Sequence, residues 1–137
     1  LADRRMLERL IIVAALLILV LVVTAGVRAV TRRRLAAAQG RLLPEALRAL
    51  LPSHAPGIVY FFGPRCAACR QQAQVLDQLA TDTGALVVRI DAAGEQALAD
   101  ALAVTAVPAT VIVDAGYVVR AINLGFRSRN VLEAQLP

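Results

Sequence analysis

The chain of 137 residues has two cysteines, Cys66 and Cys69, which are separated by two residues. This C-x-x-C spacing occurs in pairs that form and break a disulfide, and it also occurs in metal sites. A tetrahedral metal site takes about four ligands, and two thiolates supply only half of them. We therefore predict thiol–disulfide exchange without a metal. A metal site and a cysteine pair without redox activity are the two alternatives.

The residues on either side of the cysteines predict the elements that hold them. Ile58–Phe62 is a run of β-branched and aromatic residues, as expected of a buried strand. A Gly-Pro pair then ends the strand. Beyond the cysteines, apolar residues share one helical face at Val75, Leu76 and Leu79. The pattern predicts strand, short turn and helix, with Cys66 at the first turn of the helix.

At that position Cys66 would lie among unpaired backbone N–H groups, at the positive end of the helix dipole. Both favour an anion, so we expect a lowered pKa for the Cys66 thiol and a nucleophilic thiolate. Cys69, one turn further on, is the expected resolving cysteine. Arg65 adds positive charge beside Cys66. We expect Arg65 to help lower the same pKa, with a solvated charge as the alternative.

The cysteine segment and a second segment, Val104–Thr110, resemble the thioredoxin family. The second segment is similar to the family's cis-proline loop. The resemblance implies that Val107 and Pro108 face the cysteine pair and hold an extended substrate chain beside Cys66. It covers roughly residues 42–137. It implies an α/β, thioredoxin-like fold, which is a mixed four-stranded sheet flanked by helices.

Patterning predicts the remaining elements of that fold. An amphipathic helix is expected at 43–51, with Pro44 at its first position. The apolar run 85–91 predicts a strand that is covered on both faces. The other predicted elements are a small helix at 92–103, a strand at 111–113, a turn at 114–116, a strand at 117–121 and a closing helix at 128–135 with Ser128 as its N-cap.

The chain departs from the thioredoxin pattern around the cysteines. Thioredoxins carry Trp before the first cysteine and Gly-Pro between the two, where this chain has Arg65 and Ala67-Ala68. Tyr60 falls at the family's buried aspartate, which assists proton transfer from the resolving thiol. Gln74 replaces a helix proline. These differences leave exchange chemistry possible, disfavour a general-purpose thioredoxin, and leave the redox direction open.

A long apolar run, Leu10–Val27, lies near the N-terminus and contains no charged residue. As a helix it would span roughly 27 Å, close to the thickness of a bilayer's hydrocarbon core. A cleaved signal peptide and a buried soluble helix are the alternatives, but the run is longer than a usual signal core and lacks an Ala-x-Ala cleavage site. We predict a charged lead at 1–9, an uncleaved transmembrane helix with its basic flank at 10–31, a linker and amphipathic helix at 32–56, and a thioredoxin-like domain at 57–137.

Arginines flank the apolar run on both sides. Arg28, Arg32, Arg33 and Arg34 follow it, and three arginines precede it. We expect the following cluster to contact the headgroups of the lipid bilayer, with docking to a partner complex as the alternative. The positive-inside rule favours a single-pass protein of the cell membrane whose soluble domain is cytoplasmic. An extracytoplasmic domain stays open, because many membrane-tethered thioredoxin relatives face outward.

The net charge of +5 is concentrated in the N-terminal part of the chain. Residues 1–56 carry nine arginines and three acidic residues, whereas 57–137 carry six arginines and seven acidic residues. The excess of basic charge therefore belongs to the membrane-flanking part. With no Trp and only five Phe and Tyr residues, base stacking has little support, and we predict no nucleic-acid partner. His54, the single histidine, is expected in a surface loop.

The favoured function is a membrane-tethered oxidoreductase that exchanges disulfides with protein thiol and disulfide substrates. It needs no cofactor beyond a redox-active Cys66–Cys69 disulfide. The tether would confine the domain to targets at the same membrane and raise their effective concentration. The alternative is a non-catalytic accessory subunit of a larger membrane complex. That subunit would pack through the small helix residues Ala14, Ala15, Ala25 and Gly26 and dock through its thioredoxin-like domain.

Overall fold

The computed structural model describes residues 2–52 and 55–137. His54, which we expected in a surface loop, lies outside the described residues. The chain divides into two compact units, one that ends at Arg34 and one that runs from Leu35 to Pro137.

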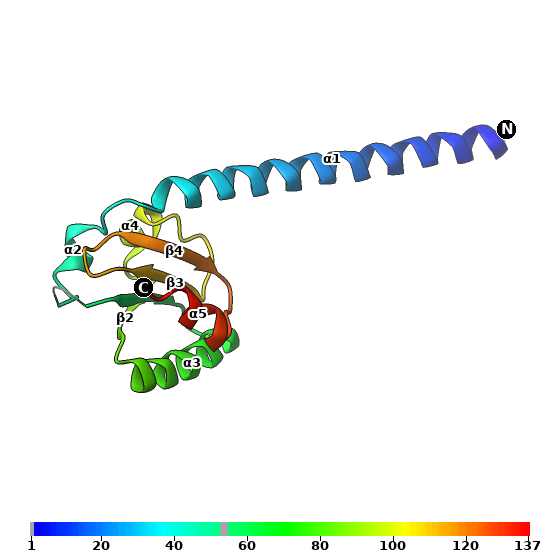
Figure 1. The fold of residues 1–137 in the computed structure, drawn as a ribbon. Helices are drawn as coiled ribbons and strands as arrows, with labels where there is room; N and C mark the ends of the chain where they lie inside the picture. Colours follow the sequence, from blue (N-terminus) through cyan, green and yellow to red (C-terminus); the bar gives the residue numbers. More distant parts are fainter. Residues whose placement is uncertain (1, 53–54) are drawn as a thin grey trace. The chain divides into compact units, whose positions relative to one another are not determined.

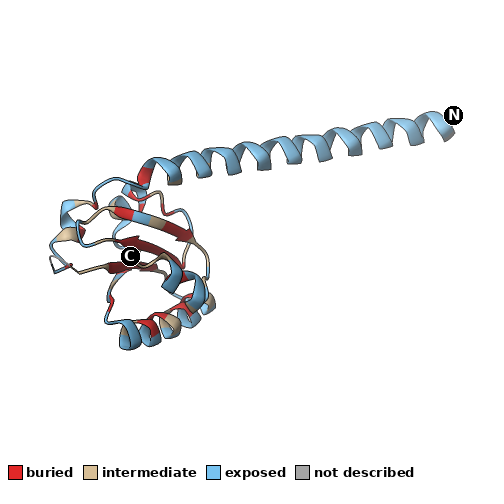
Figure 2. Cartoon of the chain, in the orientation of Figure 1, coloured by how far each residue is buried: buried red, intermediate tan, exposed pale blue. Residues whose placement is uncertain are grey.

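The first unit is helical throughout. Helix α1 spans Ala2–Ala38, and nearly all of its side chains up to Arg34 are exposed (Figure 2). Its apolar part is long enough to cross a bilayer, a property that it shares with signal sequences near an N-terminus. The Thr24 hydroxyl donates to the Leu21 carbonyl at 3.0 Å. The single hydroxyl of the apolar run is therefore satisfied within the helix, as an apolar surrounding requires.

The second unit is built around a mixed four-stranded sheet (Figure 1). Its strands are β1 (Gly57–Phe62), β2 (Leu86–Asp91), β3 (Ala109–Val113) and β4 (Val119–Leu124), and their order in the sheet is β2-β1-β3-β4. β1 is parallel to β2 and antiparallel to β3, and β3 is antiparallel to β4. The helices that flank the sheet are α2 (Glu45–Arg48), α3 (Ala67–Thr83), α4 (Gln96–Ala101) and α5 (Arg129–Gln135). The predicted mixed sheet flanked by helices is confirmed.

Alternate residues of β1 pack into two different apolar clusters. Successive side chains of a strand point to opposite faces, so Val59 and Phe61 face one cluster and Ile58 and Tyr60 the other. The α2/α4 cluster consists of Ala38, Leu43, Leu47, Leu51, Val59, Phe61, Ile90, Ala99, Leu102, Val104, Ala109, Val111, Val113, Val119 and Ile122. The α3/α5 cluster consists of Ile58, Tyr60, Cys69, Leu76, Leu79, Ile112 and Leu132.

Strand β2 lies at the edge of the sheet, where it pairs only with β1. Ile90 is its one buried residue, while Leu86, Arg89 and Asp91 are exposed. The prediction that this strand is covered on both faces is therefore wrong. An apolar run predicts a strand but does not determine its position in the sheet, and an edge strand exposes side chains that a central strand would bury.

The predicted helix at 43–51 is reduced to the four residues of α2. Its apolar side chains are nevertheless in place, because Leu43, Leu47 and Leu51 are all buried in the α2/α4 cluster. The hydrophobic pattern therefore identified the buried side chains correctly, although the backbone is helical over a shorter stretch.

The connection between β3 and β4 is two residues longer than predicted. Tyr117 has a left-handed backbone, with φ of 63°, which a strand cannot hold, so β4 starts two residues later than expected. Asp114 fixes the turn, because its Oδ1 accepts hydrogen bonds from the N–H groups of Gly116 (2.9 Å) and Val118 (3.0 Å). The bond from Val118 is the main reason why the pKa of the Asp114 carboxyl is lowered.

The last two helices also differ from their predicted limits. Asp91 Oδ1 accepts a hydrogen bond from the Ala93 N–H at 3.0 Å, and the resulting turn delays the start of α4 to Gln96. Helix α5 has the predicted Ser128 at its N-cap position, but the serine hydroxyl makes no capping hydrogen bond.

Candidate redox site

The two cysteines form a disulfide at the start of α3, with Cα atoms 5.1 Å apart. Cys66 is the N-cap residue of α3, and the Cys69 N–H donates to Cys66 Sγ at 3.1 Å. A sulfur at this position accepts the kind of hydrogen bond that a helix N-terminus offers to an anion. The predicted strand–turn–helix arrangement therefore places Cys66 where a thiolate would be stabilised.

The two sulfur-bearing residues differ in how far they are buried. Cys69 is 4% exposed and belongs to the α3/α5 cluster, whereas Cys66 is only partly buried at the edge of that cluster. A partner molecule can therefore reach Cys66 and not Cys69. This asymmetry fits the nucleophilic and resolving parts predicted for them.

The predicted substrate-binding residues lie beside the cysteine turn. A Cβ added to Gly63 would be 3.1 Å from Val107 Cγ2, so the two segments approach as closely as a glycine allows. The bond between Val107 and Pro108 is cis. The Pro108 carbonyl accepts from the Gly125 N–H at 2.8 Å, which ties this loop to the end of β4.

The backbone of Val107 is available to an incoming chain. Within residues 2–52 and 55–137, its N–H and C=O make no hydrogen bond, and its side chain is half-buried between the two clusters. An extended peptide can pair with such groups as an added strand.

The Tyr60 side chain lies next to Cys69. Its side chain is buried, and its hydroxyl donates to the Cys69 carbonyl at 2.7 Å. Burial raises the pKa of the Tyr60 hydroxyl, and the nearby Arg89 guanidinium opposes that rise. The hydroxyl therefore keeps its proton at neutral pH, and Tyr60 acts here as a hydrogen-bond donor and not as a base.

A pocket of about 220 Å³ opens against the disulfide. This arginine pocket is lined by Tyr60, Phe62, Gly63, Arg65, Cys66, Cys69, Arg70, Ala73 and Arg89. Arg65 is exposed and has a left-handed backbone with φ of 56°, so the turn presents it at the rim. Of the three arginines only Arg65 was predicted as a site residue. Arg89 is 23 residues from Cys66, and only the pairing of β2 with β1 brings it to the pocket.

A second, larger hollow lies on the other side of the cysteine turn. This proline groove, of about 650 Å³, is lined by Gly63, Pro64, Ala92, Ala93, Gln96, Ala99, Asp100, Val104, Thr105, Ala106 and Val107. Gly63 lines both hollows, so the cysteine turn forms the ridge between them. The groove contains one acidic side chain, that of Asp100, and no arginine.

Gln72 is a buried polar residue that the sequence analysis did not identify. It is fully buried on α3; its Nε2 donates to the Arg127 carbonyl at 3.1 Å, and its Oε1 accepts from the Arg127 N–H at 2.7 Å. The signal was its spacing, since it continues the inward face that carries Cys69, Leu76 and Leu79.

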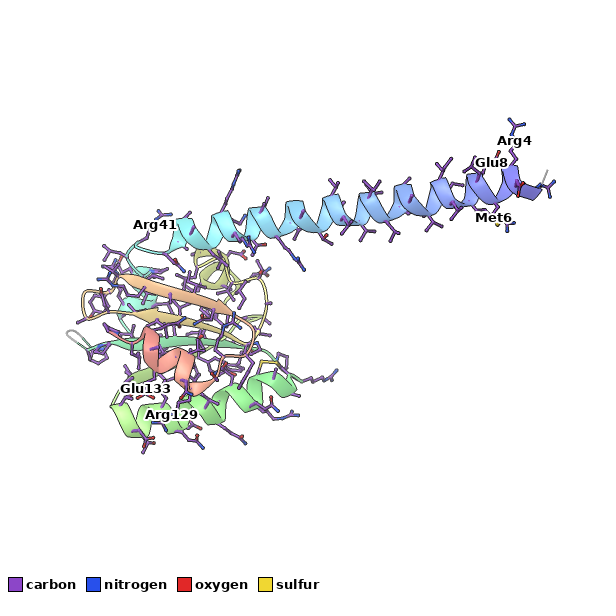
Figure 3. The ribbon with its side chains drawn as sticks, turned by 45° about the vertical axis from the view of Figure 1, so that its right-hand side comes forward. Arg4, Met6, Glu8, Arg41, Arg129 and Glu133 are labelled. Carbon is purple, nitrogen blue, oxygen red and sulfur yellow. A yellow bond between two sulfur atoms is a disulfide. The ribbon has the colours of Figure 1, made fainter. Side chains whose placement is uncertain are left out.

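The C-terminal helix is joined to α3 and β4 by further polar contacts. Arg129 pairs with Asp82 of α3 and with Glu133 of its own helix. Figure 3 labels Arg129 and Glu133 on α5. Asn123 is buried and its amide donates to Thr110 Oγ1 at 3.2 Å and to Gln135 Oε1 at 2.7 Å. These contacts hold α5 against the same face of the sheet as the cysteines.

The remaining predicted site residues lie elsewhere. Arg28, Arg32, Arg33 and Arg34 are exposed residues of α1 in the first unit. In the described part of the chain, no three His, Cys, Asp or Glu side chains are grouped so that they could hold a metal ion.

Three solved thioredoxins are similar to the second unit. A mutant thioredoxin from Halobacterium salinarum is 26% identical with a TM-score of 0.60, and the match covers 72% of this chain and 84% of that one. Thioredoxin-2 of the malaria parasite, a component of its protein secretion machinery, is 26% identical with a TM-score of 0.55 over 58% of this chain and 79% of its own. Fasciola hepatica thioredoxin, at 24% identity, supports the fold with a TM-score of 0.58 over 69% and 95%.

The family comparison extends beyond this unit. No curated protein matches the chain. Residues 27–136 match the family described as TraF, F plasmid transfer operon protein. The match covers most of the chain, including the cysteine turn, the loop that contains Val107 and all four strands. The chain therefore belongs to the TraF family of F plasmid transfer operon proteins, and its second unit has a thioredoxin-like fold.

Proposed function

We propose that the chain exchanges disulfides with protein substrates through Cys66 and Cys69, with the disulfide between them as its redox group. The observation that carries the proposal is the asymmetry of the pair. Cys66 is reachable at a helix N-terminus, Cys69 is buried behind it, and the nearby Val107 backbone makes no hydrogen bond to any residue that the structure describes.

The exchange follows from that arrangement. In the reduced protein the Cys66 thiolate attacks one sulfur of a substrate disulfide, a bond forms between the two, and the other substrate sulfur leaves as a thiolate. Cys69 then loses its proton and attacks Cys66 Sγ, so that the first substrate sulfur also leaves as a thiolate. The substrate gains two electrons, and the pair returns to the disulfide. Substrate oxidation is the same sequence in reverse.

Three further residues support the reaction in different ways. Val107 pairs through its backbone with an extended substrate segment, and Pro108 holds the loop that presents it. Arg65 adds positive charge beside the Cys66 thiolate. Since Tyr60 keeps its own proton, it does not take the proton that Cys69 loses.

The first unit would serve as a membrane tether. A helix with large apolar side chains exposed along its length requires an apolar surrounding, and the arginines from Arg28 to Arg34 would meet the headgroups. The excess of arginine after the apolar run favours a cytoplasmic domain at the cell membrane. Labelling a cysteine tag in intact cells with an impermeant reagent tests the side, and labelling from outside would contradict it.

Cys66→Ser tests the proposed reaction. We expect the full chain in uncharged detergent micelles to catalyse reduction of insulin by dithiothreitol, and the variant to retain no more than about 1% of that rate, because serine is a poor nucleophile at neutral pH. In Cys69→Ser the resolving step is lost, so a mixed disulfide with the substrate should accumulate. Arg120→Gln, a surface change on β4, is the control. Equal rates for Cys66→Ser and the unaltered chain would refute the reaction.

An accessory subunit is the second candidate, and the family match favours it, since the family is described by a transfer operon. In that case the second unit docks on a larger membrane complex. Native electrophoresis in mild detergent separates the two proposals. Co-migration with a large complex that survives loss of both cysteines supports the subunit, and a solitary small species counts against it.

A further inference from the structure

We propose that the arginine pocket binds an acidic side chain of the protein substrate, next to the cysteine that exchanges with Cys66. This inference rests on the proposed exchange reaction and names its substrate class: proteins with Asp or Glu close to the reacting sulfur.

The pocket has the position and size that a substrate side chain needs. Both cysteines line it, so whatever occupies it is in contact with the disulfide. Its volume of about 220 Å³ is below the roughly 300–1,000 Å³ of sites that enclose a whole small ligand. The pocket is therefore large enough for one or two side chains of a protein substrate, whose backbone would remain outside it.

The charge of the pocket selects an anion. Three of its nine lining residues are arginines and none is acidic. Arg89 is paired with Asp77, whose side chain is 66% exposed, while Arg65 and Arg70 form no ion pair with any residue that the structure describes. At least two guanidinium groups are therefore left for a ligand.

The walls of the pocket strengthen that selection. Phe62, Ala73 and the ring of Tyr60 supply apolar surface behind the arginines. A charge pair that is partly removed from water interacts more strongly than one in free solution. A guanidinium also matches the geometry of a carboxylate, to which it can donate two parallel hydrogen bonds.

The other side of the cysteine turn has the opposite character. The proline groove carries Asp100 and no arginine, so an acidic substrate side chain would be repelled there. The acidic group is therefore accepted on one side of the reacting sulfur only, and it sets the direction in which the substrate chain crosses the turn.

Peptide disulfides of matched sequence test this inference. The reduced full chain, in uncharged detergent micelles, is mixed with disulfide-linked peptide homodimers that carry Glu, Gln or Lys beside the cysteine. Second-order rate constants are measured by separating the thiol and disulfide peptides. Each rate constant is divided by the one for reduction of the same peptide disulfide by dithiothreitol, an uncharged dithiol. This division removes the effect of the neighbouring charge on the peptide sulfur itself.

We expect the Glu peptide to react about three- to tenfold faster than the Gln peptide at low salt, the Lys peptide to be slowest, and the differences to shrink at high salt. The double variant Arg70→Gln, Arg89→Gln should lower the Glu to Gln ratio to the part that Arg65 alone sustains. Arg120→Gln should leave the ratio unchanged, because Arg120 pairs with Asp114 near the start of β4. The loop that contains Pro108 is bonded to Gly125, just beyond the other end of that strand.

Two results overturn the inference alone: equal normalised rates for the three peptides, or a Glu preference that is undiminished in the double variant. Failure of every peptide to exchange with the reduced chain would instead overturn the proposed function, and the inference with it.

Discussion

The two faces of the sheet are built from different kinds of residue. The buried members of the α2/α4 cluster are all apolar, whereas the face toward α3 and α5 also buries Tyr60, Gln72, Thr110 and Asn123 together with the disulfide. Tyr60 bonds to Cys69, Gln72 to the backbone of Arg127, and Asn123 to both Thr110 and Gln135.

This difference indicates that the α3/α5 face determines the geometry of the site. Packing among apolar side chains requires the right volume and tolerates exchange of one apolar residue for another. Buried hydrogen bonds also require particular atoms at particular distances, because an unpaired polar group inside the protein is costly. We therefore expect substitutions on the α2/α4 face to change stability alone, and substitutions on the α3/α5 face to change stability and the cysteine turn together.

The largest expected effect on stability is at Phe61, which is fully buried in the α2/α4 cluster. Phe61→Ala should lower the free energy of unfolding by about 3–5 kcal/mol, because it removes a large side chain and leaves a cavity. At urea concentrations where the variant is still folded, alkylation of reduced Cys66 should proceed at the unaltered rate. Near-ultraviolet circular dichroism follows the unfolding. Phe126→Ala, at an exposed phenylalanine, is the matched control, and an equal loss in both variants would contradict the assignment of the core.

Gln72→Leu should have the next largest effect. The change keeps the volume but leaves the N–H and C=O of Arg127 without partners, at a cost of about 2 kcal/mol. Because α3 begins at the cysteines, we also expect faster hydrogen exchange at the first turn of α3. Gln71→Leu changes the exposed neighbouring residue and should do neither. If Gln72→Leu and Gln71→Leu are equally stable, the hydrogen bonds of Gln72 do not hold α3 to the segment that precedes α5.

Tyr60→Phe gives a smaller effect that depends on pH. Loss of the bond to the Cys69 carbonyl should cost about 1 kcal/mol at neutral pH. Burial raises the pKa of Tyr60 in the folded protein. The protonated hydroxyl therefore stabilises the fold fully at pH values below the ordinary tyrosine pKa of about 10. This contribution is lost as the pH rises above that value. Urea unfolding between about pH 9 and 11, roughly one unit either side of that pKa, should therefore show a fall in stability that Tyr60→Phe reduces.

The chain favours a clear result in this experiment. It has no lysine, and its cysteines are closed in a disulfide, so few other side chains titrate in the same range. Tyr117→Phe is the control, because the Tyr117 hydroxyl makes a longer bond, 3.3 Å, to the Leu51 carbonyl. A fall of the same size in unaltered chain and Tyr60→Phe would show that another group is responsible.

Local patterns predicted most of the elements that surround the cysteines. The strand before them and the helix after them each follow from a short stretch whose residue types restrict the backbone, whereas the loop of Val107 and Pro108 came from the resemblance to thioredoxins. The resemblance to thioredoxins supplied the order in which these pieces assemble. Helical spacing also placed Leu76 and Leu79 on the buried face of α3.

The properties that depend on distant pairing could not be predicted. The apolar run of β2 has the composition of a central strand, and only the sheet order shows that it lies at the edge. Gln72 bonds to a residue 55 positions further on. Arg89 reaches the arginine pocket because β2 pairs with β1 in register, Tyr60 opposite Arg89. A single sequence does not specify such contacts, since many partners satisfy the same local pattern.

The smallest expected effect on stability concerns the one arginine of the pocket that already has a partner. Arg89 and Asp77 are both substantially exposed, so Asp77→Asn should change the free energy of unfolding by less than about 0.5 kcal/mol. The same change frees the Arg89 guanidinium, and the preference for a Glu over a Gln peptide disulfide should rise by roughly twofold, the size expected of one exposed charge. Asp82→Asn removes a carboxylate of the same helix that pairs with Arg129 instead, and it should leave the peptide preference unchanged. A preference that stays constant in Asp77→Asn would mean that Arg89 does not contribute to the charge that a substrate meets. The arginine pocket would then depend on Arg65 and Arg70, both of which border the cysteine turn itself.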